Sequence, residues 1–282
     1  MQMKRKRFWI IFSSVVAGIF LLCLCSVMFT RLKTVNVELR TSLGADSNLS
    51  ENVLDNVKES GEFDYSKSLL FENFNESIDK IEKSNPYVKV EQIVRKFPNK
   101  LHVYVSERVP KYRVKDENEN SKWYILDVEF KVLETIVGDE DLTSSKLKNE
   151  TVEVKFLSFT AAHNGDFINK PAEKKYMSQI LAGVYGRTKD TTIMYSVDFS
   201  STDNVFYISM KENKSGDYEN GCVMEIQGTN NLTEKVFSAT CCYCQDNVEQ
   251  SGEVDLSQKV IIIVEGENGS YSGKMKNQEE QE

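Results

Sequence analysis

Apolar and polar residues alternate along residues 85–110 in the pattern of two successive β-strands. The second strand is marked by strict alternation of apolar with polar positions, at Leu101, Val103 and Val105. In the first strand the alternation slips between Val90 and Ile93, which predicts a β-bulge or a short strand. The segment 97–100 contains a proline and an asparagine suited to a turn, so we expect the chain to reverse there.

Three further elements are predicted upstream of this pair. Alternation predicts a strand at 34–39, and apolar residues at helical spacing predict helices at 50–60 and 73–83. Gly61 and Pro86 end the two helical patterns. The order strand, helix, helix, strand, strand describes a small α+β domain.

An uncharged apolar run occupies residues 8–29. At about 1.5 Å per helical residue, it spans the roughly 30 Å hydrocarbon core of a bilayer. A cleaved signal peptide is the alternative, but the run exceeds an ordinary signal-peptide core and lacks a small-x-small cleavage site. We interpret 8–29 as a transmembrane helix and 1–7 as a basic tail in the cytoplasm, because four basic residues before the run outnumber Arg31 and Lys33 after it. The bulk of the chain then lies outside the cytoplasm.

The second half of the chain is predicted to be rich in strands. They are expected at 123–127, 130–133, 152–159, 191–199, 205–210, 222–226 and 259–265. A polar linker at 115–121 precedes the first strand, and a polar turn region at 213–221 joins two later ones. With its helices, this half predicts an α+β fold with a mainly antiparallel β domain rather than a wound parallel sheet.

Two helices are predicted among these strands. One begins at Pro171, which suits a first helical turn, and its apolar pattern ends at Gly186. The other begins with Asn231 and Glu234 in capping-box register. Its expected apolar face consists of Phe237, Thr240, Cys241 and Cys244.

A family resemblance is carried by the stretch with which we began. Its most specific residues are Asn85, Pro86, Arg95, Phe97, Pro98, Glu107, Arg108 and Pro110. With the alternating valines between them, they resemble the end of the POTRA domain of the bacterial cell-division family FtsQ/DivIB. The resemblance implies a POTRA domain at 32–110 and a β domain at 111–266. Two positions depart from the family pattern, since Arg40 and Glu129 stand where relatives carry turn glycines, so we expect altered loops there.

The resemblance also implies a function. Members of this family are non-catalytic scaffolds of the divisome that sit in the cytoplasmic membrane at the division septum and link septum formation to peptidoglycan synthesis. The implied partners are the small membrane proteins FtsL and DivIC, called FtsB in Gram-negative relatives, bound at the far end of the β domain.

A partner-facing sheet edge is our hypothesis for the last apolar run. It consists of Val260, Ile261, Ile262, Ile263 and Val264, and its position late in the domain suits addition of a partner strand. The alternative, that the run is an interior strand buried on both faces, fits its unbroken apolar character equally well. The polar, acidic tail at 267–282 is predicted to be disordered.

Composition and motifs point away from nucleic-acid binding and catalysis. The net charge is −8 and the pI is about 5.1, whereas phosphate contacts need clustered basic residues. No Gly-rich phosphate loop, nucleophile elbow or zinc-protease motif occurs, and His102 and His163 are the only histidines. We therefore expect no enzyme activity, cofactor or small-molecule substrate.

A cysteine cluster, Cys241-Cys242-x-Cys244, invites a metal interpretation. Zinc needs four ligands with paired spacings, and the nearest further cysteine, Cys222, lies on a separate predicted strand. We favour core packing and expect no metal, and a disulfide from Cys222 to one of the other three stays open.

Six N-x-S/T sequons support an alternative function. They begin at Asn48, Asn75, Asn149, Asn213, Asn231 and Asn268. They suit a membrane-anchored or secreted binding protein or glycoprotein unrelated to division. Chance occurrence in an Asn- and Ser-rich chain is the simpler explanation, and Asn75 and Asn231 stand at helix starts, where a capping role explains them better.

Overall fold

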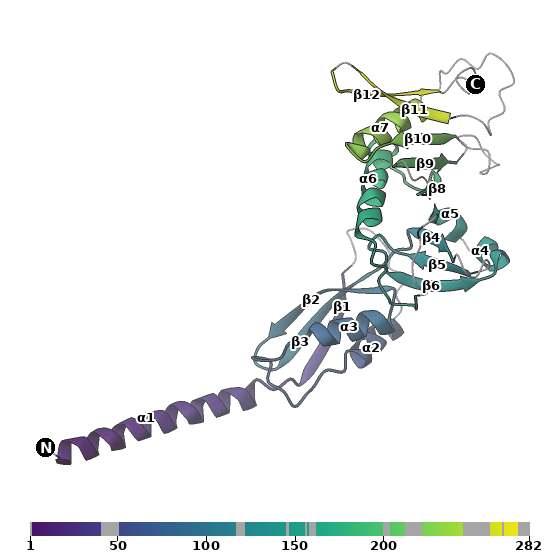
Figure 1. Ribbon diagram of the computed structural model, residues 1–282. Helices are drawn as coiled ribbons and strands as arrows, with labels where there is room; N and C mark the ends of the chain where they lie inside the picture. Colours follow the sequence, from purple (N-terminus) through teal and green to yellow (C-terminus); the bar gives the residue numbers. More distant parts are fainter. Residues whose placement is uncertain are drawn as a thin grey trace. The chain divides into compact units, whose positions relative to one another are not determined.

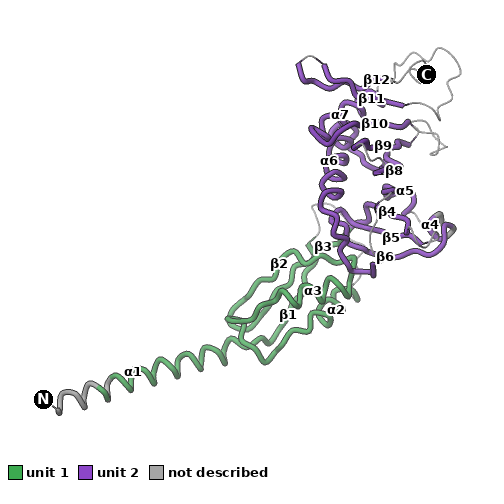
Figure 2. Tube along the Cα trace, viewed as in Figure 1, with its two compact units in different colours: residues 1–108 green, residues 109–282 purple. Residues whose placement is uncertain are grey.

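The computed structural model describes residues 2–40, 51–116, 122–144, 147–155, 157, 162–199, 204–211, 222–244, 260–266 and 268–275. The predicted turn region at 213–221, most of the linker at 115–121 and the polar loop after Arg40 lie outside these residues. The chain forms two compact units, residues 1–108 and 109–282 (Figure 2).

Unit 1 begins with helix α1, Gln2–Phe29, which includes the predicted apolar run and extends back through the basic residues before it. Within α1, Phe12–Phe29 has a mean hydropathy of 2.4 and is long and apolar enough to cross a membrane. This helix is consistent with a single-pass anchor or a signal sequence.

The rest of unit 1 is a three-stranded sheet backed by two helices (Figure 1). Its elements are β1 (Thr34–Leu39), α2 (Glu51–Ser60), α3 (Asn75–Ser84), β2 (Val88–Lys96) and β3 (Lys100–Glu107). The strand order is β1-β3-β2, with β1 parallel and β2 antiparallel to β3. The predicted order of elements is confirmed, and so is the bulge, because the β2–β3 register shifts between Val90 and Gln92.

The core of unit 1 follows from the alternation of apolar residues. Leu101, Val103 and Val105 on β3 are fully buried, as are Val57 on α2 and Ile81 on α3. Burying each such side chain contributes about 1.5–3 kcal/mol. The Phe97–Pro98 peptide bond in the β2–β3 turn is cis.

Unit 2 is built on a nine-stranded mixed sheet (Figure 1). Its strands are β4 (Tyr112–Lys115), β5 (Lys122–Leu126), β6 (Val132–Val137), β7 (Val152–Lys155), β8 (Met194–Asp198), β9 (Val205–Met210), β10 (Val223–Gln227), β11 (Val260–Glu265) and β12 (Tyr271–Met275). The order across the sheet is β12-β11-β10-β9-β8-β7-β4-β5-β6. Neighbours are antiparallel except at β4–β7, β7–β8 and β10–β11, so the α+β class and the mainly antiparallel sheet are confirmed.

Two long helices and two short ones accompany this sheet. They are α6 (Pro171–Thr188), α7 (Leu232–Tyr243), α4 (Asp139–Ser144) and α5 (Leu147–Glu150), and the sequence did not indicate the last two. Helix α7 packs against α6 and against β10, β11 and β12.

Helix α6 begins at Pro171 as predicted but continues past Gly186 to Thr188, and Lys189 then takes the left-handed conformation. Gly186 is therefore not a stop signal. A Cβ atom at this position would lie 3.1 Å from the ring of Phe237, so the glycine allows α6 to approach α7 closely.

The predicted apolar face of α7 was largely wrong, although Thr240 is buried as expected. Its buried residues are Leu232, Val236, Ala239, Thr240 and Cys242, whereas Phe237 is 40% exposed. The predicted cap is also absent, because the side chain of Asn231 makes no capping bond and donates instead to the Tyr271 hydroxyl at 3.1 Å. Packing against α6 and β12, rather than a local cap, sets which face of α7 is buried. Asn75 likewise does not cap α3, whose N-cap position is Phe74.

The turn after Asp127 needs no glycine. The Asp127 carboxylate accepts hydrogen bonds from the backbone N–H groups of Glu129 at 2.8 Å and Lys131 at 2.9 Å. Phe130, not Glu129, takes the left-handed conformation with φ of 61°. Its ring is fully buried and packs edge-on against Tyr112, so burial of the phenylalanine stabilises a conformation that usually favours glycine.

The tail after residue 266 differs from the disorder expected of it. Residues 271–275 form β12, which pairs antiparallel with β11 from Ile261↔Met275 to Glu265↔Tyr271. Polar residues of the segment lie on its exposed face. Pairing with the apolar strand β11 keeps the segment ordered, which its composition alone did not predict.

Candidate partner-binding edge

Strand β11 contains the apolar run that we took for a sheet edge, and the structure places it between two other strands. Val260, Ile261 and Ile262 pair with β10, and β12 covers the opposite side. The hypothesis that this run is the outer edge is therefore wrong. The alternative is also only partly right, because Ile261 is buried whereas Val260, Ile262, Ile263 and Val264 are half-buried.

Strand β12 is the outermost strand on this side of the sheet. Within the described part of the chain it pairs with β11 alone, so its other side presents backbone N–H and C=O groups. Such an edge can accept a further strand from another chain.

Helix α7 holds β12 in place from one face. The Ser238 hydroxyl donates to the backbone carbonyl of Tyr271 at 3.0 Å. A Cβ atom at Gly273 would lie 2.8 Å from the Cβ of Cys242 and 2.9 Å from the carbonyl of Ser238, so only glycine fits at this approach. Strand β12 thus packs on α7 through the Ser238 hydrogen bond, and Gly273 allows the two backbones to approach closely.

An open groove of about 430 Å³ adjoins this edge. It is lined by residues of α6 and α7 and by the β11–β12 turn, chiefly Ala182, Gly186, Phe237, Ser270 and Tyr271. The exposed ring of Phe237, which the sequence assigned to the core, forms part of its wall.

The POTRA residues identified in the sequence mostly tie elements of unit 1 together. The Asn85 side-chain amide donates to the Ser60 hydroxyl at 3.0 Å and to the Ile81 carbonyl at 3.1 Å, joining the ends of α2 and α3 just before Pro86. Arg95 donates to the Glu72 carbonyl at 2.7 Å.

Arg108 is the most buried of these residues, with a side chain 3% exposed. Its guanidinium bonds the Glu82 carboxylate of α3 at 2.8 Å and the Val88 carbonyl at 3.3 Å. The second Glu82 oxygen accepts the backbone N–H of Val90 at 2.9 Å, so the pair fastens α3 to β2. Glu107 ends β3, and Pro110 follows three residues later in unit 2.

Phe97 and Pro98 are exposed, as is Arg95, and they lie at the turn between β2 and β3. The group identified from the sequence is therefore largely a structural group and is not brought together in one site.

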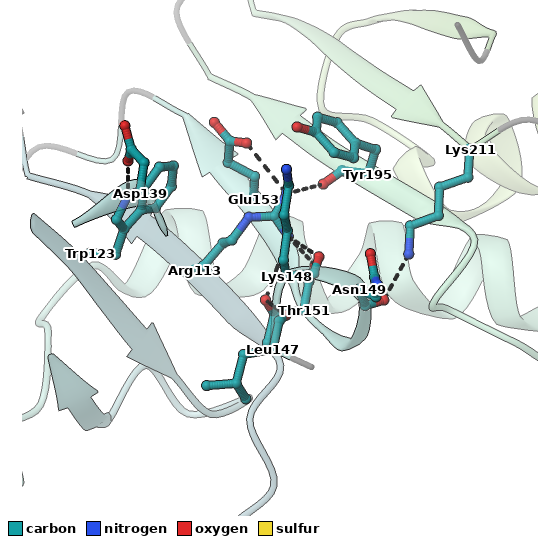
Figure 3. A network of polar contacts seen from close by, with 10 residues as sticks. All are labelled: Arg113, Trp123, Asp139, Leu147, Lys148, Asn149, Thr151, Glu153, Tyr195 and Lys211. Atoms are coloured by element: carbon teal, nitrogen blue, oxygen red, sulfur yellow. Dashed lines mark hydrogen bonds and ion pairs between the residues drawn. The ribbon is translucent and has the colours of Figure 1, made fainter. Parts of the chain in front are cut away.

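A polar network centred on Arg113 crosses the sheet of unit 2 (Figure 3). Arg113, on β4, is 1% exposed and donates to the Lys148 carbonyl at 2.9 Å, to the Thr151 carbonyl and to Glu153 of β7 at 3.4 Å. It also reaches the Tyr195 carbonyl of β8 at 3.5 Å. One side chain thus links three strands where the β4–β7 ladder comprises only two residue pairs.

Two lysines lie close to this network. Lys211 donates to the Asn149 carbonyl at 2.7 Å (Figure 3), and Lys111 bonds the Thr191 hydroxyl. Burial lowers the pKa of both lysines below the ordinary value, and nearby Arg113 lowers the pKa of Lys211 further. The pKa of Asp190, whose charge favours both ammonium groups, is lowered chiefly by the backbone N–H of Thr192 that donates to it.

The pattern of apolar and polar residues did not predict this network. Its only signal was Arg113 itself, a charged residue between Tyr112 and Val114 in an otherwise apolar strand, and β4 was not predicted because we assigned its end to the linker.

The cysteines are all free thiols, so Cys222 is not paired with Cys241, Cys242 or Cys244. Cys242 packs in the core, and burial raises its pKa. In the residues that the structure describes, no group of three or more His, Cys, Asp and Glu side chains is arranged to hold a metal ion.

Comparison with known protein families matches residues 53–108 to a POTRA domain of the FtsQ type. This range includes all the POTRA residues named above except Pro110. A search of curated proteins found no match. The chain carries an FtsQ-type POTRA domain, which is characteristic of FtsQ/DivIB, so the resemblance inferred from residues 85–110 is confirmed.

Proposed function

We propose that this chain is an FtsQ/DivIB-like division protein that anchors in the cytoplasmic membrane and docks other division proteins outside the cytoplasm. The observation that carries the proposal is the FtsQ-type POTRA domain at 53–108. Proteins with this domain are generally non-enzymatic, and the task we assign to this chain is to link septum formation to peptidoglycan synthesis by binding.

Helix α1 is the anchor in this proposal. Its span, Phe12–Phe29, follows the basic residues 4–7, a charge arrangement that keeps the N-terminus in the cytoplasm. The domains after α1 then act at the outer surface of the cytoplasmic membrane, at the septum.

Strand β12 is the surface that we assign to the partners FtsL and DivIC, or FtsB. A partner strand that pairs with β12 gains about four or five backbone hydrogen bonds, worth roughly 2–7 kcal/mol in total. After association costs this alone gives a weak complex.

Two features supplement those hydrogen bonds. The groove lined by Phe237 and Tyr271 adjoins β12 and offers apolar surface to a partner side chain. Anchoring of both proteins in one membrane also raises their effective concentration.

Co-purification tests the proposal. The full-length chain, solubilised from membranes, is expected to retain FtsL and DivIC of the same organism. Gly273→Val, which places a branched side chain against Cys242 and Ser238, is expected to displace β12 and lower partner recovery at least tenfold.

Ser272→Thr provides the matched control. Ser272 is exposed on the neighbouring position of β12, and the substitution adds only a methyl group there. Equal recovery with Gly273→Val and Ser272→Thr would remove β12 from the interface. Failure of the unmodified chain to retain either partner would contradict the division function.

A further inference from the structure

Three segments of unit 1 meet at the point where the chain leaves α1. They are residues 30–34, the loop at 64–73 and the β2–β3 turn with its flanks at 95–100. The backbone N–H of Leu69 donates to the Thr30 carbonyl at 2.8 Å, and that of Leu32 donates to the Lys67 carbonyl at 3.2 Å. The carbonyl of Asn99 accepts the N–H of Lys33 at 2.9 Å, so both loops are bonded directly to the first residues after the helix.

Large apolar side chains on these two loops are exposed. Phe71 is 80% exposed and Phe97 57%, and Tyr65 and Leu70 are each nearly half exposed. Their neighbours Leu69 and Phe74 are buried in the core of the same domain. The exposed residues therefore do not belong to that core, and they lie on two loops that the same short segment holds together.

The charge of these segments is opposite to that of the whole chain. They contain six basic residues, Arg31, Lys33, Lys67, Arg95, Lys96 and Lys100, and two acidic ones, Asp64 and Glu72. The chain as a whole carries −8. Aromatic rings interspersed with lysine and arginine are typical of protein surfaces at the level of lipid headgroups, where rings enter the interface and cations meet phosphates.

Connectivity places these loops near a membrane if α1 spans one. Thr30 follows the last residue of α1. Its hydroxyl is hydrogen-bonded to the hydroxyl of Ser68, with 2.6 Å between the two oxygens. No linker separates the end of the helix from the loops, so they cannot move far from the bilayer surface.

We propose that the segments at 64–73 and 95–100 dock on the outer leaflet of the membrane, with Phe71 and Phe97 in the headgroup region and the surrounding lysines on anionic lipid phosphates. The docking supplements α1 and holds the POTRA domain against the bilayer. It rests on the proposed function in one respect, since α1 must be retained in the membrane.

Fluorescence quenching by brominated lipids tests this docking. The full-length chain is reconstituted in nanodiscs of phosphatidylglycerol and brominated phosphatidylcholine, with no partner protein present. In a Trp9→Phe background, tryptophan introduced as Phe71→Trp or Phe97→Trp is expected to lose about half of its fluorescence to lipids brominated near the glycerol, as an interfacial residue should. Trp123 in unit 2 contributes a constant background.

Val109→Trp is the matched control. Val109 is 67% exposed and follows β3, whose opposite end at Lys100 pairs with Thr34 beside α1. The length of β3 places its far end, Glu107, roughly 23 Å from the turn, and Val109 follows that end by two residues in the chain. Its fluorescence is expected to be unaffected by bromine.

The outcomes separate docking from anchoring. Quenching of native Trp9, which lies near the start of the span, by lipids brominated near the glycerol reports that α1 is in the membrane, independently of the loops. Quenching of Trp9 without quenching at positions 71 and 97 would overturn the docking and leave the division function intact. Absence of quenching at Trp9 would overturn both. Quenching at 71 and 97 that appears only after FtsL and DivIC are added would overturn docking by this chain on its own.

A second experiment tests whether the docking needs the basic residues. The variant Lys33→Gln/Lys96→Gln/Lys100→Gln is expected to weaken quenching at Phe71→Trp, and so is replacement of phosphatidylglycerol by zwitterionic lipid. Unchanged quenching under both conditions would show that the basic residues do not take part, contrary to the proposal.

Discussion

Among the residues that the structure describes, one arginine is buried in each unit, Arg108 in unit 1 and Arg113 in unit 2, and the two are used differently. Arg108 in unit 1 pairs with Glu82 at 2.8 Å, in a sheet whose β2–β3 ladder extends over eight residue pairs. Arg113 in unit 2 bonds mainly backbone carbonyls, where the β4–β7 ladder has two pairs. In unit 1 the arginine joins a helix to a sheet that is already continuous. In unit 2 it is part of what makes the sheet continuous.

The largest expected effect is that of Arg108→Ala. The substitution removes the guanidinium that neutralises the largely buried Glu82 carboxylate, which typically costs about 3–5 kcal/mol. We expect unit 1 as a whole to become less stable. Hydrogen exchange should therefore become faster for the amides of β1, β2 and β3 together. Lys80→Ala, which breaks exposed ion pairs with Glu62 and Glu76 in the same unit, should leave that stability nearly unchanged. Equal effects of the two substitutions would show that burial of the Arg108 pair is irrelevant.

A smaller and more local effect is expected of Arg113→Ala. Loss of the bonds to Thr151, Lys148 and Glu153 should cost about 2–3 kcal/mol. Because the short β4–β7 ladder depends on them, hydrogen exchange should accelerate in β4 and β7 well before it changes in β9 and β10. Uniform acceleration across the sheet would contradict the role of Arg113 at this junction.

The smallest effect concerns pH. Burial lowers the pKa of Lys211 below its ordinary value of 10.5, so as pH approaches 10.5 the unfolded chain retains a proton that the folded chain has already released. The contribution of Lys211 to the free energy of unfolding therefore rises as the pH increases from the lowered pKa of the folded chain to 10.5. Relative to Lys211→Met, the natural chain should become more stable as the pH is raised toward 10.5, measured by urea denaturation. A constant or falling difference would mean that burial does not perturb this lysine in solution.

Sequence patterns predicted unit 1 better than unit 2, for a physical reason. The elements from β1 to β3 follow local periodicity, and the slip between Val90 and Ile93 correctly indicated the bulge. Each of these signals lies within a few residues of the structure that it predicts. The exposed Phe97 was identified as a family residue, but its exposure became evident only from the fold.

Unit 2 depends on contacts between residues far apart in the sequence. The face of α7 was mispredicted because packing against α6 and β12 sets which of its residues are buried. Its cap was mispredicted because Asn231 bonds Tyr271, forty positions away, instead of capping its own helix. Strand β12 was missed because its ordering comes from β11 and α7, and Arg113 was missed because its partners lie on other strands. Gly186 was read as a stop although it serves the approach to Phe237.

Partner capture by β12 is the claim on which the proposed division function depends most directly. It is tested by hydrogen exchange of the full-length chain with and without purified FtsL–DivIC complex. We predict that the amides of Tyr271–Met275 become at least tenfold more protected when the partner binds, while those of β1 and β2 do not change. Formation of a stable complex with no added protection in β12 would contradict the account.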